Sequence, residues 1–519
     1  MSTTHKSIAA PLAGCFALTI FLGAFLLFQI QPLISKAILP WYGGTPNVWT
    51  TCMLFFQSLL FAGYAYAHYT TRWLPPRGQG ILHIALVTVA LLMPVLPAAH
   101  WKPDAAAQPT WHIFWLLTAH VGLPFFVLAS TSPLIQYWWN RAFPHGSPYK
   151  LYALSNTGSL MALLSYPFLV EPWLPLSSQA VSWTAAFLVF AALVLACGSS
   201  SWWTRRQPPP LPPRGANPTG PAAAAMQRFL WVALAAVGAL ILLATTNHIS
   251  HDIAVVPLLW VLPLSLYLLT FIFCFAGCYP RWTSISIMLI LTTYILLDQL
   301  GTVTWVAEQL GTEVTGISGV PESYLAALLT YLLTMTVCCM VCHGEMVRLK
   351  PPPRGLTSYY LHIGFGGALG GLAVAVGGPL LLNGHYELQI GMILCWLLLL
   401  VVLYLDPASA RYASRSVWAC LISSALFGAF ACGMFFDILK PTPGRVASAR
   451  SFYGVLAVNE EYVDDEDLHH FELVHGLIVH GKQYTHPDKR RWATTYYGPL
   501  SGAGLAMEWT ADRPARRIG

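Results

Sequence analysis

The segment 451–505 is the longest polar stretch of the chain, and four histidines lie in or beside its strand-like runs. Histidine titrates near neutral pH and binds metals. The four are His469, His470, His475 and His480. The runs 451–458, 469–474 and 477–480 alternate like short strands, and His475-Gly476 fits a hairpin turn. Neighbouring strand side chains point to opposite faces, which separates His469 from His470. We therefore expect a hairpin and no metal site here.

A second candidate is Cys339-Met-Val-Cys342-His343, which has the spacing of covalent c-type haem attachment. It lies at the end of an apolar run whose following charges mark the cytoplasmic side, where haem is not attached. Helix packing of the cysteines is the simpler interpretation. We expect His343 and Glu345 to cap this helix and contact the neighbouring half of the bundle, or to line a membrane cavity.

A third candidate is the pair His248 and His251, one helical turn apart, followed by Asp252. Such spacing can place two metal ligands on one helix face. A solvated or hydrogen-bonded helix end with a structural or gating role is the simpler interpretation, and we predict no metal.

Four amides lie inside or at the ends of apolar runs: Gln29, Gln31, Gln57 and Asn156. Polar side chains at membrane depth are costly and usually face the bundle interior or an aqueous cavity. They either line a substrate path or form hydrogen bonds between helices, and the sequence leaves both open.

The composition defines the setting of these residues. Apolar residues make up 56% of the 519 residues, charged residues make up 9%, and the net charge is +6. Such a chain is a polytopic membrane protein, because helices of about 20 apolar residues span a bilayer. The small net charge argues against nucleic acid as a partner, and the lipid bilayer is the expected environment. We predict thirteen spans, near 11–30, 47–67, 80–98, 111–131, 150–170, 178–197, 228–246, 254–277, 283–300, 322–342, 357–380, 388–405 and 416–436.

A repeat divides the apolar region into two halves. Trp49 recurs as Trp260 and Gly158 as Gly367, at offsets close to 210. Two six-span halves around a long loop are typical of transporters of the major facilitator superfamily (MFS). The expected fold is therefore an all-α, MFS-like bundle followed by a small β-rich domain. Its parts are a first transmembrane half (1–200), a Pro/Arg-rich cytoplasmic linker (201–227), a second half with an extra span (228–437) and the β domain (438–519).

Loop charges give an orientation. Counted from a cytoplasmic N-terminus, the odd loops hold only Lys36 and Lys102 as basic residues. The even loops hold Arg72, Arg77, Arg141, Lys150, Arg205, Arg206, Arg214, Arg228, Arg281, Arg348, Lys350, Arg354, Arg411 and Arg415. The positive-inside rule then places the even loops and the N-terminus in the cytoplasm. The side of the C-terminal domain stays open. Lys440, Arg445 and Arg450 favour the cytoplasm, with the thirteenth span re-entrant or miscounted.

Several motifs resemble bacterial fused MFS/spermidine synthase membrane proteins. They are Gln29-Ile-Gln-Pro32, Leu39-Pro-Trp-Tyr-Gly-Gly44, Trp49-Thr-Thr-Cys-Met-Leu-Phe-Phe-Gln57, Leu154-Ser-Asn-Thr-Gly-Ser-Leu160, Cys342-His-Gly-Glu345 and the order of elements in 451–505. The resemblance implies a bacterial plasma-membrane location and polyamine substrates. It also implies that His480, Gly481 and Gln483 form a turn of the substrate pocket, with Tyr496 and Tyr497 as its aromatic wall.

Spermidine synthases continue into a Rossmann-like domain that holds decarboxylated S-adenosylmethionine. The residues Arg516-Arg-Ile-Gly519 look like the first strand of that domain, so we expect its catalytic half to be absent from this sequence. Two functions follow as hypotheses. One is aminopropyl transfer to a polyamine on an MFS-like platform. The other is an MFS-like transporter or scaffold whose C-terminal module binds a ligand without catalysis.

Overall fold

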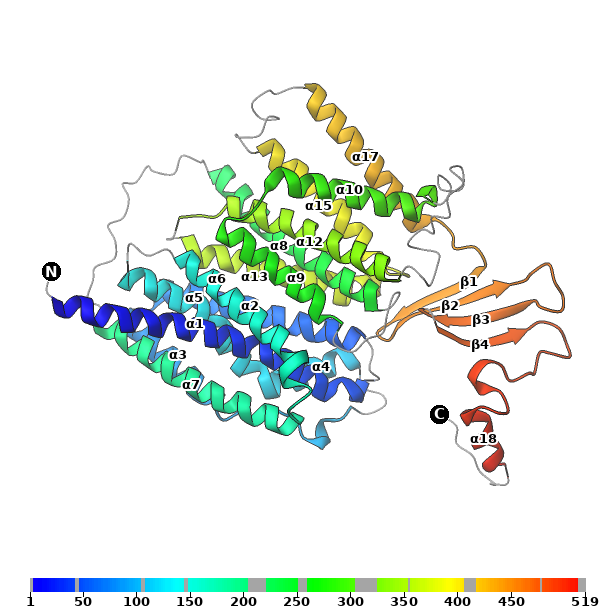
Figure 1. Cartoon of the computed structure of the whole chain (residues 1–519), viewed down its shortest axis with the longest axis horizontal. Coiled ribbons are helices and arrows are strands. Elements are labelled where there is room, and N and C mark those ends of the chain that lie inside the picture. The colour runs from blue at the N-terminus through cyan, green and yellow to red at the C-terminus, as the bar shows by residue number, and fades with distance from the viewer. Residues whose placement is uncertain are drawn as a thin grey trace.

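The computed structural model describes residues 3–42, 46–103, 108–143, 148–203, 221–250, 259–303, 324–352, 355–405, 417–476 and 478–511. A helical bundle forms most of it, and a small sheet stands at one end of the bundle (Figure 1). We call the end where the first helix begins the proximal end and the opposite end, which carries the sheet, the distal end.

The first half holds six helical crossings. They are α1 (Thr3–Ile38), α2 (Pro46–Trp73), α3 (Pro76–Ala90), α4 (Pro109–Leu117) continued by the π-turn η3 (Thr118–Gly122) and α5 (Leu123–Ala142), α6 (Pro148–Ser165) with η4 (Tyr166–Val170), and α7 (Leu176–Trp203). The short 3₁₀ turns η1 (Leu39–Tyr42) and η2 (Ala99–Trp101) lie in distal loops.

The second half follows the same plan and adds one helix. It contains α8 (Pro221–His248), α9 (Val261–Ala276), α10 (Arg281–Gln299), α12 (Tyr324–Arg348), α13 (Leu356–Leu372) with η8 (Ala373–Gly377) and α14 (Gly378–Leu381), α15 (Glu387–Leu405) and the added α17 (Val417–Leu439). The linker is shorter than predicted, because 201–203 belong to α7 and Pro221 already opens α8. Proline is favoured in the first turn of a helix, and the alanines after it favour helix. Residues 204–220 lie outside the described residues.

The bundle has the character of a membrane protein. Among the described residues, eleven segments are long and apolar enough to cross a bilayer. The shorter helices α3 and α9 pack among them, at the positions of two further predicted spans. Outward-facing side chains are apolar: Val181 is 70% exposed and Ile290 is 65% exposed. Such an apolar outer surface is suited to contact with lipid.

The packing of the helices confirms the two predicted halves. In the first half α1 packs against α5, α6 and α7, and in the second half α8 packs against α12, α13 and α15, which hold the corresponding places. Between the halves, α2 contacts α13 and α6 contacts α9. The two contacts are equivalent, because α2 corresponds to α9 and α13 corresponds to α6. A two-fold axis between the halves requires such a pair of contacts. Corresponding helices run in the same direction, so this axis lies along the bundle, as in MFS-like repeats.

Small residues allow the closest of these approaches. A Cβ on Gly370 would lie 2.3 Å from the backbone oxygen of Ala236 on α8, and one on Gly158 would lie 2.7 Å from that of Phe21 on α1. Glycine at these positions lets α13 and α6 press against the central helix of their own halves.

The C-terminal domain is an antiparallel meander, β1 (Arg445–Ser451), β2 (Gly454–Glu461), β3 (His470–His475) and β4 (Ile478–Tyr484), followed by η9 (Thr495–Tyr497) and α18 (Gly502–Trp509). The hairpin at His475-Gly476 is confirmed, with Gly476 at φ 58°. The single strand predicted for 451–458 is wrong, because a tight turn at Phe452-Tyr453 divides it between β1 and β2.

The sheet lies at the distal end, opposite the N-terminus (Figure 1). The basic residues after the last span favoured a C-terminal domain on the same side as the N-terminus, and this prediction is wrong. The reason is that α17 runs from the proximal to the distal end as an unbroken helix. Arg450, one of the charges behind that preference, is not a free loop charge. It is paired at 2.5 Å with Glu387 at the start of α15, and both side chains are almost fully buried.

Candidate functional site

A cavity of about 160 Å³ lies between the two halves. Residues of α1, α2, α5 and α6 form its first-half wall, and residues of α8, α9 and α13 form the opposite wall. It therefore occupies the interface that the two-fold repeat creates. In bundles of this kind the substrate site is found at this place.

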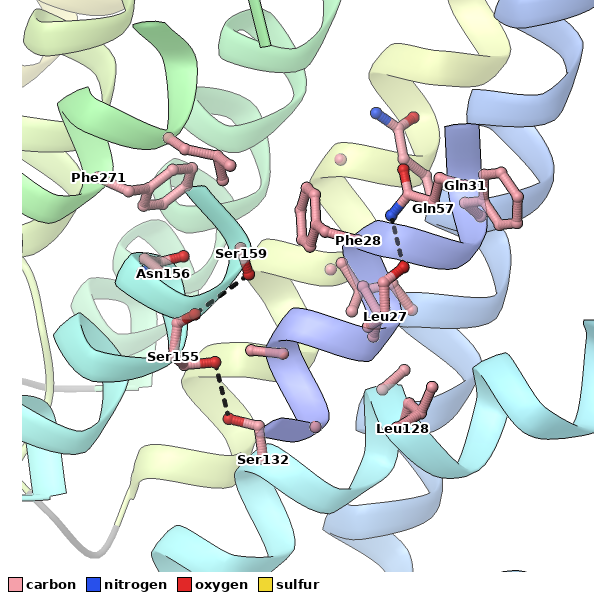
Figure 2. A pocket seen from close by; sticks show the side chains of 18 of the residues that line it. Leu27, Phe28, Gln31, Gln57, Leu128, Ser132, Ser155, Asn156, Ser159 and Phe271 are labelled. Atoms are coloured by element: carbon pink, nitrogen blue, oxygen red, sulfur yellow. Dashed lines mark hydrogen bonds between the residues drawn. The ribbon is translucent and has the colours of Figure 1, made fainter. Parts of the chain in front are cut away.

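Three of the four predicted amides line the cavity: Gln31, Gln57 and Asn156 (Figure 2). Gln31 Nε2 donates to Leu27 O at 3.3 Å, and Asn156 Nδ2 donates to Tyr152 O at 3.2 Å. Both bonds are long and stay within one helical turn. The substrate-path alternative therefore fits these three residues better than bonding between helices does.

Gln29 behaves differently. It is buried, and its Nε2 donates to Ala162 O and Ser165 Oγ of α6, at 2.8 Å each. It does not line the cavity, so the helix-bonding alternative holds for Gln29. Gln29 and Gln31 are only two residues apart on α1, but residues two apart on a helix face different directions. Gln29 therefore bonds α6, whereas Gln31 lines the cavity.

Five Ser and Thr residues that we did not single out in the sequence also line the cavity: Thr19, Thr131, Ser132, Ser155 and Ser159. Ser132 Oγ donates to Ser155 Oγ at 3.4 Å, and Ser159 Oγ donates to the Ser155 carbonyl at 3.1 Å (Figure 2). Serine is common in membrane helices, where its hydroxyl bonds the backbone of its own helix. A serine in an apolar run therefore does not by itself predict a cavity residue. The spacing of Ser155, Asn156 and Ser159 on one helix face was the available signal.

At the distal end, contacts between the halves span the interface. Trp49 and Trp260, the pair that the repeat relates, stack with ring centroids 3.5 Å apart. Beside this distal pair, Thr50 Oγ1 donates to Asn247 Oδ1 at 2.8 Å, from α2 to α8. The stacking of two repeat-related side chains places the two-fold axis between them.

At the proximal end, a second aromatic stack spans the interface. Tyr152 of α6 lies against Tyr360 of α13 with centroids 5.0 Å apart and planes 14° from parallel. The Tyr360 hydroxyl donates to Gln136 Oε1 of α5 at 2.9 Å. The cavity lies between the distal pair and this proximal pair.

His343 and Glu345 do not line the cavity. His343 is buried behind Phe271, with ring centroids 3.7 Å apart, and its Nδ1 bonds Thr270 Oγ1 at 2.8 Å. Glu345 accepts from Arg281 Nε at 2.7 Å and from the Tyr279 hydroxyl at 3.0 Å. The expected contact with the neighbouring half is wrong, since all these partners belong to the second half. Glu345 joins α12 to the start of α10.

The described histidine and cysteine residues considered as metal or haem ligands pack against other side chains. His248 packs its ring against Tyr331, at 4.3 Å between centroids, and Asp252 lies outside the described residues. Cys339 and Cys342 are fully buried between helices, where the Cys342 thiol meets that of Cys395 at 3.8 Å. This is the packing role that the sequence favoured. No group of three metal-binding side chains occurs among the described residues.

In the C-terminal domain, the structure brings three of the five predicted residues together. His480 Nδ1 lies 2.5 Å from the Tyr496 hydroxyl, and the rings of Tyr496 and Tyr497 lie 4.6 Å apart. The turn predicted at His480, Gly481 and Gln483 is wrong, because all three lie within β4, which pairs with β3. Gly481 pairs with Leu473, and Gln483, which is exposed, pairs with Phe471. Their role as a polyamine pocket remains a prediction. Binding of decarboxylated S-adenosylmethionine, which the sequence resemblance implies, also remains a prediction.

No protein-family model and no curated protein sequence matches this chain at a significant level. Among solved structures, the chain is similar to a bacterial homologue of the human lysosomal transporter Spinster, in an inward-facing and occupied conformation. The two share 14% sequence identity with a TM-score of 0.39, over 84% of this chain and 94% of that chain. A similarity this weak assigns neither a family nor a substrate. The chain is, by its own helices and packing, a polytopic membrane protein built from two six-helix halves with a cavity between them.

Proposed function

We propose that this protein is a membrane transporter that moves a small solute by alternating access between its two halves. The observation that carries the proposal is a cavity with polar side chains at the two-fold interface, with one aromatic pair across the interface toward each end. Polar residues that face a cavity inside a membrane bundle usually mark a substrate path.

The contacts across each end are aromatic stacks and neutral hydrogen bonds, which can open reversibly. Those across the distal end include the Trp49–Trp260 stack and the Thr50–Asn247 hydrogen bond. An aromatic pair contributes about 0.5–1.5 kcal/mol beyond its buried area, and a neutral hydrogen bond contributes about the same. A few kcal/mol separate the conformers of proteins that switch between two states. The two ends can therefore open in turn while each half stays packed.

The basic loop residues give the orientation of this transporter. The described helix ends that flank the even loops lie at the proximal end, so the positive-inside rule places that end in the cytoplasm. We place the protein in a bacterial plasma membrane. The distal end and its sheet then face the side of the membrane away from the cytoplasm. A sheet on that side has no access to cytosolic cofactors, which favours ligand or partner binding over aminopropyl transfer.

Aminopropyl transfer rests on the sequence resemblance and on the grouping of His480 with Tyr496 and Tyr497. We expect the purified 519-residue chain to transfer no aminopropyl group to putrescine or spermidine. Turnover by this chain would restore the enzyme hypothesis.

Cysteine labelling tests the transporter proposal. In a background where the exposed Cys278 and Cys432 are replaced by serine, Ser155→Cys places a thiol in the cavity. In oriented proteoliposomes we expect a membrane-impermeant maleimide to reach this thiol from either side, when it is added to one side at a time. Gln29→Cys, which lies off the cavity, is the matched control and should stay unlabelled. Access from neither side would refute alternating access and favour a scaffold.

A further inference from the structure

We infer that the cavity accepts a small, uncharged, amphipathic molecule, with a ring-sized apolar body and hydroxyl or amide groups. The inference rests on the proposed function, because it names the class of solute for the same cavity. It replaces the polyamine or small cation that the sequence resemblance suggested.

The first observation is the absence of charge. None of the described side chains that line the cavity is Asp, Glu, Lys, Arg or His. The nearest titratable group behind the α9 wall, His343, is shielded by Phe271 and Thr270. An ion that leaves water for such a site loses its hydration and gains no counter-charge. Aromatic rings offset only a small part of this cost for a cation, and a polyamine carries several charges.

The second observation is the uneven division of polarity between the walls. All the amides and the Ser and Thr hydroxyls come from the first half. The second half contributes Leu242, Leu264, Tyr267, Leu268, Phe271, Ile363, Gly364 and Gly367. The Tyr267 hydroxyl is therefore its only side-chain polar group among the described lining residues. A ligand that matches both walls is polar on one face and apolar on the other.

The third observation is unused hydrogen-bonding capacity. Gln57 Oε1 is buried and has no partner among the described residues. The bonds of Gln31 and Asn156 are long and local, so a ligand can replace them at little cost. These groups form two sets, Gln31 with Gln57 and Asn156 with the serines, and Phe28 lies between them (Figure 2). Two separated polar contacts with a ring between them fit a compact molecule with polar groups at both ends.

The size of the cavity limits the apolar body. Its volume is about 160 Å³. A dry cavity of about 150 Å³ holds one benzene ring. The cavity therefore suits a single ring with short substituents rather than a lipid or a peptide.

Three probes that differ only in charge test the inference. They are 4-(2-hydroxyethyl)phenol, which is neutral, 4-(2-aminoethyl)phenol, which is a cation, and 4-hydroxyphenylacetate, which is an anion. Titration calorimetry on the purified chain in nanodiscs measures each dissociation constant at pH 7. We expect the neutral probe to bind at least about a hundredfold more tightly than either ion, because neither ion finds a counter-charge. Equal or tighter binding of the amine, or of spermidine, would overturn the inference.

Two substitutions on α1 form a matched pair. Gln31→Leu removes an amide that lines the cavity, and Gln29→Leu removes one that bonds α6. We expect Gln31→Leu to weaken binding of the neutral probe about two- to tenfold, the effect of one lost hydrogen bond. Gln29→Leu should leave the dissociation constant unchanged, and an equal loss in both variants would place the probe elsewhere. The comparison of the three probes on the unchanged protein needs neither variant to fold.

Flux of the neutral probe into proteoliposomes separates this inference from the proposed function. Selective binding without flux would leave the solute class standing and refute transport. Flux of spermidine with no binding of the neutral probe would support transport and overturn the solute class.

Discussion

The buried ion pair between the sheet and the bundle gives the sharpest quantitative prediction. Arg450 Nη2 and Glu387 Oε1 lie 2.5 Å apart, and their side chains are 4% and 6% exposed. Arg450 also donates to the backbone oxygen of Gly384. Removal of one partner of a buried pair leaves an uncompensated charge and costs about 3–5 kcal/mol. We expect Glu387→Gln to weaken docking of β1 and β2 on α15 by this amount.

A second ion pair supplies the control. Lys36 Nζ and Glu171 Oε1 also lie 2.5 Å apart, but their side chains are 40% and 34% exposed. Exposed pairs contribute about 0–1 kcal/mol, so Glu171→Gln should change little. This pair joins α1 to the residue after η4 rather than to the sheet, so Glu171→Gln controls for the loss of a paired carboxylate elsewhere in the chain.

Hydrogen exchange is the assay, since it reports local opening of the sheet without global unfolding. A loss of about 3–5 kcal/mol raises exchange of the β1 and β2 amides by two to three orders of magnitude or more, wherever exchange proceeds through undocking. The double variant Arg450→Met with Glu387→Leu should recover most of the protection, because an apolar pair of similar volume often replaces a buried ion pair. Equal exchange in Glu387→Gln and Glu171→Gln would refute the reasoning.

Three further predictions concern topology, pH and packing. Ser451→Cys should react with an impermeant maleimide added outside intact cells, and reaction only after lysis would reverse the proposed orientation. Burial acts to raise the pKa of Glu472, but hydrogen bonds and charge from Lys482 and His470 outweigh it, so its pKa is lowered. The lowered pKa of Glu472 contributes about 1 kcal/mol or less to the stability of the sheet after solvent screening. This contribution is present above the unfolded pKa of about 4.3 and is lost as the pH falls through the pKa of the folded state. Acid titration of sheet exchange should show this loss, and Lys482→Met should flatten it. Gly370→Val would place side-chain atoms within the backbone of α8 at Ala236, so the yield of folded protein in a detergent-solubilisation assay should fall sharply, and a normal yield would contradict the α8–α13 contact.

The sequence predicted the bundle well because hydrophobic runs report directly on helices in a bilayer. The spans and the two halves followed from run length and from repeats such as Trp49 and Trp260. Cavity residues were only partly accessible. Amides in apolar runs are few and stand out, which identified Gln31, Gln57 and Asn156, but the sequence did not separate Gln29 from them. That separation depends on the rotation of α1 against α6.

The side of the sheet was predicted incorrectly for a different physical reason. The positive-inside rule counts Arg450 as an exposed loop charge, whereas the fold buries it against Glu387, more than sixty residues earlier in the chain. Pairing over such a separation has no local sequence signal. The turn at Phe452-Tyr453 was also missed, because alternation continues across it and only the register of β1 on β2 reveals it.

The central claim is that the two halves rock around the cavity, and distances across both ends test it most directly. Spin labels at Trp173 and Leu381 report the distal end, and labels at Trp73 and Cys278 report the proximal end, all at exposed positions. Double electron–electron resonance in nanodiscs, with and without the neutral phenol, measures both distributions. We expect two populations at each end, with the distal distance long where the proximal distance is short. A single unchanged distance at both ends would contradict alternating access and leave a rigid membrane scaffold.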